Sequence, residues 1–237
     1  VDGDTVTFSL TGGLDQSVLS IDKDSGVLNF NTPPDFELPA DSDGNNTYEV
    51  TVAATDGTNS ATQNVTITVT NVNDNPPIIT SATPISTAEN TSSTAYMATA
   101  DDADGDTVTF SLTGGLDQAA LSIDNNSGVL NFNASPDFEL PADSDGNNVY
   151  EVTVAATDGI NSATQNVTIT VTNVNDNPPI ITSATAINAV ENTSSTAYTV
   201  TADDADSDTV TFSLTGGLDQ AALSVDSNSG VLNFISS

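Results

Sequence analysis

The sequence repeats itself at a period of 102 residues, and this period constrains the fold more than any other feature. The segment Asp-Thr-Val-Thr-Phe-Ser-Leu-Thr-Gly-Gly-Leu-Asp-Gln occurs three times, with its valine at Val6, Val108 and Val210. Such a period is too long for one turn of a solenoid and is about the size of an independently folding domain. We therefore expect a row of similar domains.

Only the middle domain is whole under this division. We expect an N-terminally incomplete repeat at residues 1–75, a complete repeat at 76–177 and a C-terminally incomplete repeat at 178–237. The two incomplete repeats overlap, because residues 3–31 and 207–235 cover the same part of the repeat, which argues against their completing each other between molecules. We interpret the chain as a segment of a longer array.

Apolar and polar residues alternate within the complete repeat. Val108, Phe110 and Leu112 alternate with threonine and serine, and residues 150–156 and 167–171 follow the same pattern. A period of two is typical of half-buried β-strands, and Gly, Asn and Asp gather where turns should fall. The pattern predicts an all-β fold of tandem seven-stranded Greek-key β-sandwiches with an immunoglobulin-like topology.

The charge of the chain excludes several classes of function. There are 33 acidic side chains, one basic side chain (Lys23), no histidine and no cysteine. A nucleic-acid or anionic membrane partner would need clustered basic residues, which are absent. We expect no enzyme, because the usual bases and nucleophiles are missing. No apolar run is long enough for direct membrane insertion.

Two identical segments separate the repeats. Asn71–Pro77 returns as Asn173–Pro179, and each copy combines side-chain oxygens with a restricted backbone. Such a composition suits a linker better than a core. Oxygen-only ligands favour a hard divalent cation, and calcium above all. The two segments are therefore predicted to be joints that are rigid with Ca2+ and loose without it.

The order of motifs in the middle repeat resembles the cadherin repeat. The motifs are Glu89-Asn90, Asp102-Ala103-Asp104, Asp137-Phe138-Glu139, Ala156-Thr157-Asp158 and Asn173-Val174-Asn175-Asp176-Asn177. Each motif alone is weakly specific, but five in this order cover the whole repeat. The resemblance implies cadherin-like domains with calcium ions between successive domains.

The resemblance also implies which residues are metal ligands. For the joint of the second and third repeats these are Glu89, Asp137, Glu139, Asn173, Asn175, Asp176, Asn177, Asp204 and Asp206. For the joint of the first and second repeats they are Asp35, Glu37, Asn71, Asn73, Asp74, Asn75, Asp102, Asp104 and Asp158. The family's linker usually begins with Asp, whereas these linkers begin with Asn71 and Asn173, so we expect weaker calcium binding.

An insertion departs from the family pattern. Asp143-Ser144-Asp145-Gly146-Asn147 recurs from Asp41 to Asn45 and has the oxygen spacing of a small calcium loop. An exposed acidic turn explains the same residues.

The function implied by these features is mechanical. Similar, nearly lysine-free and cysteine-free arrays are typical of long bacterial surface adhesins, so we expect a calcium-rigidified, non-catalytic extender or stalk segment that is extracellular and at the cell surface. Its partners would be calcium and neighbouring repeats of the same chain. One alternative is a calcium-dependent carbohydrate-binding module for cell-surface glycans, with Tyr96 and Tyr198 as the remaining aromatic candidates. Another is a self-associating adhesive repeat that pairs with like filaments.

Overall fold

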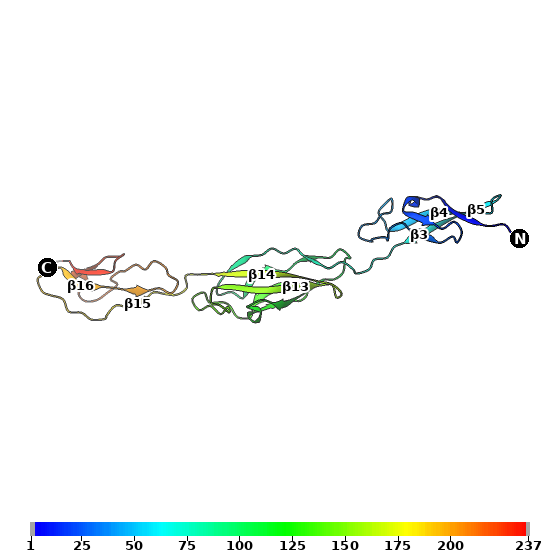
Figure 1. Ribbon diagram of the computed structural model, residues 1–237. Helices are drawn as coiled ribbons and strands as arrows, with labels where there is room; N and C mark the ends of the chain where they lie inside the picture. The colour runs from blue at the N-terminus through cyan, green and yellow to red at the C-terminus, as the bar shows by residue number, and fades with distance from the viewer. Residues whose placement is uncertain (1–2, 236–237) are drawn as a thin grey trace. The chain divides into compact units, whose positions relative to one another are not determined.

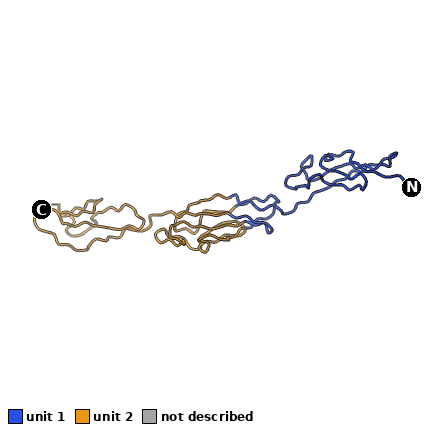
Figure 2. Tube along the Cα trace, viewed as in Figure 1, with its two compact units in different colours: residues 1–80, 99–109, 156–164 blue, residues 81–98, 110–155, 165–237 orange. Residues whose placement is uncertain are grey.

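The computed structural model describes residues 3–235. Its residues group into two compact units, which Figure 2 shows in different colours. Unit 1 consists of Val1–Thr80, Thr99–Thr109 and Ala156–Thr164, and unit 2 consists of Ser81–Ala98, Phe110–Ala155 and Gln165–Ser237. The two units do not coincide with the repeats of 102 residues. The domain boundaries at residues 75 and 177 therefore stay a prediction.

Unit 1 contains three small sheets. One has the order β1-β4-β5, built from β1 (Thr7–Gly12), β4 (Thr47–Thr55) and β5 (Ser60–Thr68). The other two are antiparallel pairs, β2 (Leu19–Ile21) with β3 (Leu28–Phe30), and β6 (Ile78–Ile79) with β9 (Ala100–Asp101).

The core of unit 1 forms around β4. Tyr48 and Val50, two residues apart on this strand, are almost fully buried together with Leu19. The ring of Phe30 meets the Tyr48 ring edge-on with centroids 4.9 Å apart. Alternate burial along β4 is the pattern that the period of two predicts for a strand.

Unit 2 contains most of the complete repeat. A four-stranded sheet has the order β10-β13-β14-β7, from β10 (Thr109–Gly114), β13 (Val149–Thr157), β14 (Ser162–Thr172) and β7 (Ile85–Ala88). Figure 1 shows β13 and β14 side by side. A second sheet has the order β11-β12-β8, from β11 (Leu121–Ile123), β12 (Val129–Phe132) and β8 (Ser93–Met97).

The strand count agrees with the predicted seven when two broken strands are each counted once. Residues 78–88 form β6 and β7, and residues 93–101 form β8 and β9. Pro84 lies between β6 and β7, and a proline has no N–H for a sheet hydrogen bond. After this break β7 pairs with β14 in parallel.

The core of unit 2 consists of inward-facing residues of both sheets. Tyr150, Val152 and Val154 alternate along β13 and are nearly inaccessible to solvent. The buried partners from other strands are Leu121, Leu130, Phe132, Val167, Ile169 and Val171. The predicted all-β sandwich fold is thus confirmed, and it places the ends of these strands close to the acidic motifs.

The remainder of unit 2 follows the second linker. It contains β15 (Ile180–Ile181) paired with β17 (Ala202–Asp203), and the sheet order β16-β19-β18, from β16 (Ser195–Thr199), β19 (Val231–Phe234) and β18 (Leu223–Val225). The 3-10 turns η1 (Gln16–Val18), η2 (Gln118–Ala120) and η3 (Gln220–Ala222) are each three residues long. None of the helices within residues 3–235 has the length and apolar character to cross a membrane.

Candidate metal centre

Asp104 holds the first linker in place. Its Oδ2 accepts hydrogen bonds from the backbone N–H groups of Asp74 (3.1 Å) and Asn75 (2.8 Å), and Asn75 Nδ2 donates to its Oδ1 (3.1 Å). Asn71 Nδ2 donates to the backbone carbonyl of Asp104 at 2.7 Å. A residue 29 to 33 positions further along the chain thus shapes the linker.

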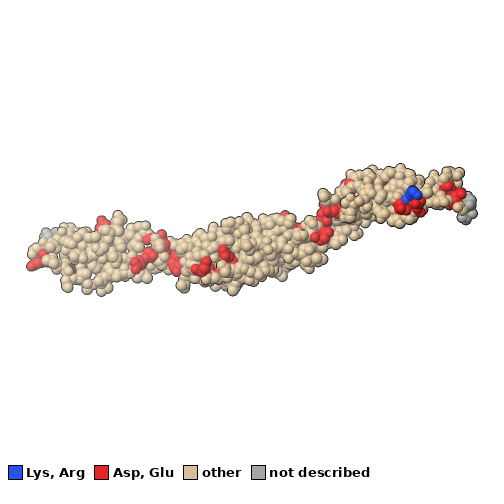
Figure 3. Space-filling model, viewed as in Figure 1, with Lys and Arg blue, Asp and Glu red and all other residues tan. Residues whose placement is uncertain are grey.

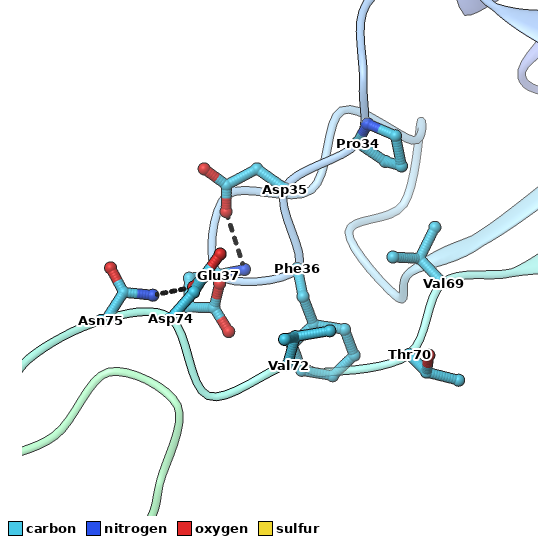
Figure 4. Close-up of a pocket in the computed structure, with 9 residues that line it drawn as sticks. All are labelled: Pro34, Asp35, Phe36, Glu37, Val69, Thr70, Val72, Asp74 and Asn75. Carbon is cyan, nitrogen blue, oxygen red and sulfur yellow. Dashed lines mark hydrogen bonds between the residues drawn. The ribbon is translucent and has the colours of Figure 1, made fainter. Parts of the chain in front are cut away.

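Three carboxylates from three separate segments converge at this linker. Ligand oxygens of Glu37, Asp74 and Asp104 lie within 4.8 Å of one another. Figure 4 shows Glu37 close to Asp74 and Asn75, in a cavity of about 310 Å³ that Asp35 also lines. Because like charges so close together repel each other, this arrangement favours a bound cation or a shared proton.

The pKa values of these carboxyls reflect the repulsion between their charges. Burial raises the pKa of Glu37, and its hydrogen bond to Asp104 and the charges of Asp104 and Asp74 raise it further. Burial also acts to raise the pKa of Asp104, but hydrogen bonds from Asn75, Glu37 and Asp74 outweigh it, and the net shift is downward. Without a cation, Glu37 therefore binds a proton more readily than an ordinary glutamate does, and Asp104 less readily than an ordinary aspartate does.

A larger cluster forms in unit 2. Glu89, Glu139, Asp176 and Asp206 offer ligand oxygens within 4.8 Å of one another, and Glu89 and Asp206 are buried. Asp206 Oδ2 accepts from the backbone N–H groups of Asp176 (3.1 Å) and Asn177 (2.7 Å), as Asp104 does at the first linker.

Linker amides complete the second cluster. Asn177 Nδ2 donates to Glu139 Oε2 (3.2 Å), Asp176 Oδ1 (2.6 Å) and Asp206 Oδ1 (3.3 Å). Asn173 Nδ2 donates to the backbone carbonyl of Asp206 at 2.9 Å, which leaves its own Oδ1 free to act as a ligand.

The pKa values at the second cluster shift in the same sense as at the first. Burial raises the pKa of Glu139, assisted by Asp206 and by the charge of Glu89. For Asp206, burial acts upward, but hydrogen bonds from Asn177, Glu139 and Asp176 lower the pKa overall.

Asp35 and Asp137, two further predicted ligands, each use one carboxylate oxygen within their own turn. Asp35 Oδ1 accepts from the N–H groups of Glu37 and Leu38, both at 3.1 Å, and Asp137 Oδ1 accepts from Leu140 N–H at 2.9 Å. Each of these carboxylates therefore shapes the turn that carries its neighbouring glutamate.

Asp158 lies beside the first linker. Its Oδ1 accepts from the N–H groups of Ile160 (2.7 Å) and Asn161 (2.6 Å), and Asn161 Nδ2 donates to Asn73 Oδ1 at 2.8 Å. At the second linker, Asn175 and Asp204 line a cleft of about 450 Å³.

Buried oxygens without a hydrogen-bond partner concentrate in the predicted ligand set. Within residues 3–235 four of them are Glu37 Oε1, Asp102 Oδ2, Glu139 Oε1 and Asp158 Oδ2. An unpartnered buried acceptor is costly, and most such atoms in proteins are satisfied. Cations bound at the two joints would give these oxygens a partner, so the donor set fits a hard ion such as calcium.

The ligand prediction made from the sequence missed two aspartates, Asp106 and Asp208. Asp106 groups with Asp102 and Asp104, and Asp208 groups with Asp204 and Asp206, each with ligand oxygens within 4.8 Å of one another. The alternation Asp-x-Asp-x-Asp was the signal that could have revealed them.

The surface offers these clusters no cationic side chain. Figure 3 shows acidic side chains gathered in patches, and the single blue side chain is Lys23. Lys23 Nζ lies 2.7 Å from Asp24 Oδ1, outside both clusters. Neutralisation of the clusters therefore has to come from solution, as a metal ion or as protons.

Comparison with known proteins agrees with this fold. A family model described as Bacterial Ig domain matches residues 73–170. Human Protocadherin Fat 1 is 26% identical over 251 residues, which cover 98% of this chain and 5% of that protein. Mouse Cadherin-related family member 2 is 34% identical over 194 residues, which cover 76% of this chain and 14% of that protein. The chain thus spans a small part of either relative.

Solved structures extend the likeness to the whole chain. The crystal structure of human CDH23 EC21-23 matches with a TM-score of 0.73 and 21% identity, covering 99% of this chain and 80% of that chain. Mouse Cadherin-23 EC22-24 matches with a TM-score of 0.71 and 24% identity, covering 99% and 78%.

Fold and site together define the class: β-sandwich domains with acidic clusters beside their linkers. More particularly, the chain is built from cadherin-like repeats, and the resemblance stated from the sequence is confirmed.

Proposed function

We propose that the two acidic clusters bind calcium and that the chain is a non-catalytic extender segment of a long bacterial cell-surface adhesin or filament. The observation that carries the proposal is the convergence of carboxylates from separate segments around oxygens that are buried and unpartnered. The match to a Bacterial Ig domain model supports a bacterial source.

The predicted ligands would hold the ion between neighbouring repeats. At the first joint they are Asp35, Glu37, Asn71, Asn73, Asp74, Asn75, Asp102, Asp104 and Asp158. At the second they are Glu89, Asp137, Glu139, Asn173, Asn175, Asp176, Asn177, Asp204 and Asp206. A bound ion supplies the positive charge that removes carboxylate repulsion, while the chain orients its oxygens through the linker hydrogen bonds. The linker then loses its freedom, and successive repeats keep a constant angle.

Calcium removal tests the proposal directly. In calcium at about 100 times the dissociation constant, each site should add about 2.7 kcal/mol to the free energy of unfolding. The melting temperature should therefore rise by roughly 10 °C for a domain of this size. Small-angle scattering on the same samples should change from an extended to a flexible profile after chelation. Identical melting and scattering with and without calcium would contradict the proposal, and magnesium at equal concentration is the control.

The response to pH should have opposite signs with and without calcium. In calcium-free buffer, the raised pKa values of Glu37 and Glu139 stabilise the folded chain below their ordinary value of 4.5, and this stabilisation is lost as pH rises through the raised values. The lowered pKa values of Asp104 and Asp206 stabilise it above 3.8, and that part is lost as pH falls.

With calcium present, the stability of the folded chain should instead increase as pH rises above about 4.5, because protons and calcium compete for the same oxygens. The difference in melting temperature between calcium and calcium-free samples should therefore increase between about pH 4.5 and about pH 7. A difference that is constant over this range would show that Glu37 and Glu139 are not ligands.

The carbohydrate-binding alternative loses one of its two aromatic candidates. Tyr96 is buried, and its hydroxyl donates to Gln165 Oε1 at 2.8 Å, so its ring is not a surface platform. Tyr198 is half-buried and hydrogen-bonded to Ser183 Oγ. A sugar platform needs an exposed ring face, so the extender role is better supported.

A further inference from the structure

The insertion that departs from the cadherin pattern is a loop held by several hydrogen bonds. We call residues 41–46 and 143–148 the acidic inserts. The second insert is tied to the buried Asp117, which lies outside it. Asp117 accepts hydrogen bonds from Ser144 N–H (2.7 Å) in the insert and from Glu151 N–H (2.8 Å) on β13. Asp143, also buried, accepts from the N–H groups of Asn147 (2.7 Å) and Asn148 (3.2 Å). The insert is therefore anchored at its base and closed on itself.

The last residue of the insert reaches the loop that carries the predicted ligands Asp137 and Glu139. Asn148 has a φ of 62°, a left-handed conformation that asparagine tolerates better than most residues. Its Nδ2 donates to the backbone carbonyl of Phe138 at 2.9 Å, while the N–H of Phe138 donates to Glu89 Oε2 at 2.7 Å. The N–H and the carbonyl of Phe138, which lies between Asp137 and Glu139, therefore both have hydrogen-bond partners.

The first insert makes the same contact. Asn46 has a φ of 60°, and its Nδ2 donates to the carbonyl of Phe36 at 2.8 Å, between Asp35 and Glu37. The buried Asp15 accepts from Ser42 N–H (2.7 Å) as Asp117 does in the second insert. The Oδ1 atoms of Asn46 and Asn148 are buried and accept no hydrogen bond. Since that oxygen is left unsatisfied, the donating Nδ2 is the useful part of the side chain.

We propose that Asn46 and Asn148 are positioning residues, through which the acidic inserts hold the Asp35-x-Glu37 and Asp137-x-Glu139 loops in the geometry that binds the cation. The inference rests on the proposed function, because the ion is the one proposed for the joints. It assigns the inserts a role that neither a separate calcium loop nor a solvated turn would have. A glutamate whose loop is free would have to be ordered by the ion itself, at the expense of affinity.

Two glycine variants of the full 237-residue chain test this role. Asn148→Gly keeps the positive φ, which glycine adopts freely, and removes the buried side chain together with its hydrogen bond to Phe138. Asn46→Gly is the matched change in the first insert. Calcium titrations followed by NMR at the backbone amides of Asn75 and Asn177 report the two joints separately. Asn148→Gly should weaken calcium binding at Asn177 by about threefold to tenfold and leave Asn75 unchanged, and Asn46→Gly should do the reverse.

A purely structural role gives a different result. Asp102, Asp104 and Asp158 belong to the same predicted repeat as Asn148, so general destabilisation of that repeat would weaken both joints in Asn148→Gly, and this outcome would overturn the inference. Unchanged affinity at both joints would overturn it as well, while the proposed function would stand. If the unaltered chain shows no calcium response at either amide, the proposed function and this inference fall together.

Discussion

Asp206→Asn should weaken calcium binding at the second linker by at least about 100-fold. Loss of a residue that only supports a metal ligand typically costs 10- to 100-fold in affinity, so loss of a charged ligand should reach or exceed the upper end. Asp206 is shared by two acidic groups, one with Glu89, Glu139 and Asp176 and the other with Asp204 and Asp208. Its removal therefore affects both groups at once.

In the calcium-free chain the same substitution has two opposing effects, because it also removes the stabilisation that the lowered pKa of Asp206 provides above pH 3.8. The asparagine keeps an oxygen that can accept from Asp176 and Asn177, and it removes a charge that raises the pKa of Glu139. Asp203→Asn removes an equal charge three residues away, at an exposed position of β17 outside the acidic groups, and is the matched control. Isothermal titration calorimetry of the two variants makes the comparison. Equal affinities for Asp206→Asn and Asp203→Asn would show that Asp206 is not a ligand.

Gly115→Ala should destabilise the middle repeat by about 2–5 kcal/mol, from overpacking and from an unfavourable left-handed backbone. Gly115 has a φ of +102°, and a Cβ at this position would lie 2.4 Å from the carbonyl oxygen of Glu151 and 2.4 Å from Val152 Cα. Both atoms belong to the backbone of the buried strand β13 and cannot move aside as a side chain would. The loss is a large part of the stability of a typical domain.

Gly114→Ala is the control one residue earlier. Its Cβ would lie 3.5 Å from Thr153 Oγ1, an ordinary van der Waals contact, so its effect should stay within about 0.5 kcal/mol. Urea unfolding of both variants in calcium-free buffer, followed by circular dichroism, measures the difference. Similar midpoints for the two variants would mean that β13 does not pass as close to Gly115 as the structure places it.

Much of the fold could be predicted from the sequence because its signals are local. Alternation at Tyr150, Val152 and Val154 repeats every two residues, which is the geometry of a strand facing a core, and the structure buries all three. The first strand of the complete repeat, in contrast, is divided before Pro84 into β6 and β7, which pair with different strands. The predicted seven strands did not include this break.

The candidate site was predictable in composition and less so in arrangement. Glu139 and Asp206 were expected to meet and do, but Asp35 and Asp137 use an oxygen to shape their own turns. Tyr96 was considered for a sugar platform but is buried, and its hydroxyl donates a hydrogen bond to Gln165, a residue 69 positions away. Pattern within a strand does not reveal such a distant partner.

By itself the sequence determined the period of 102 residues, the β-strands and the oxygen chemistry of the linkers, since each depends on residues that are near one another in the chain. Only the tertiary structure decided which oxygens converge, that Asp106 and Asp208 join them, and that Asn46 and Asn148 donate hydrogen bonds to the carbonyls of Phe36 and Phe138. The physical reason is that the acidic clusters are made by contacts between segments tens of residues apart. Their geometry follows from how the sheets pack and not from any local pattern.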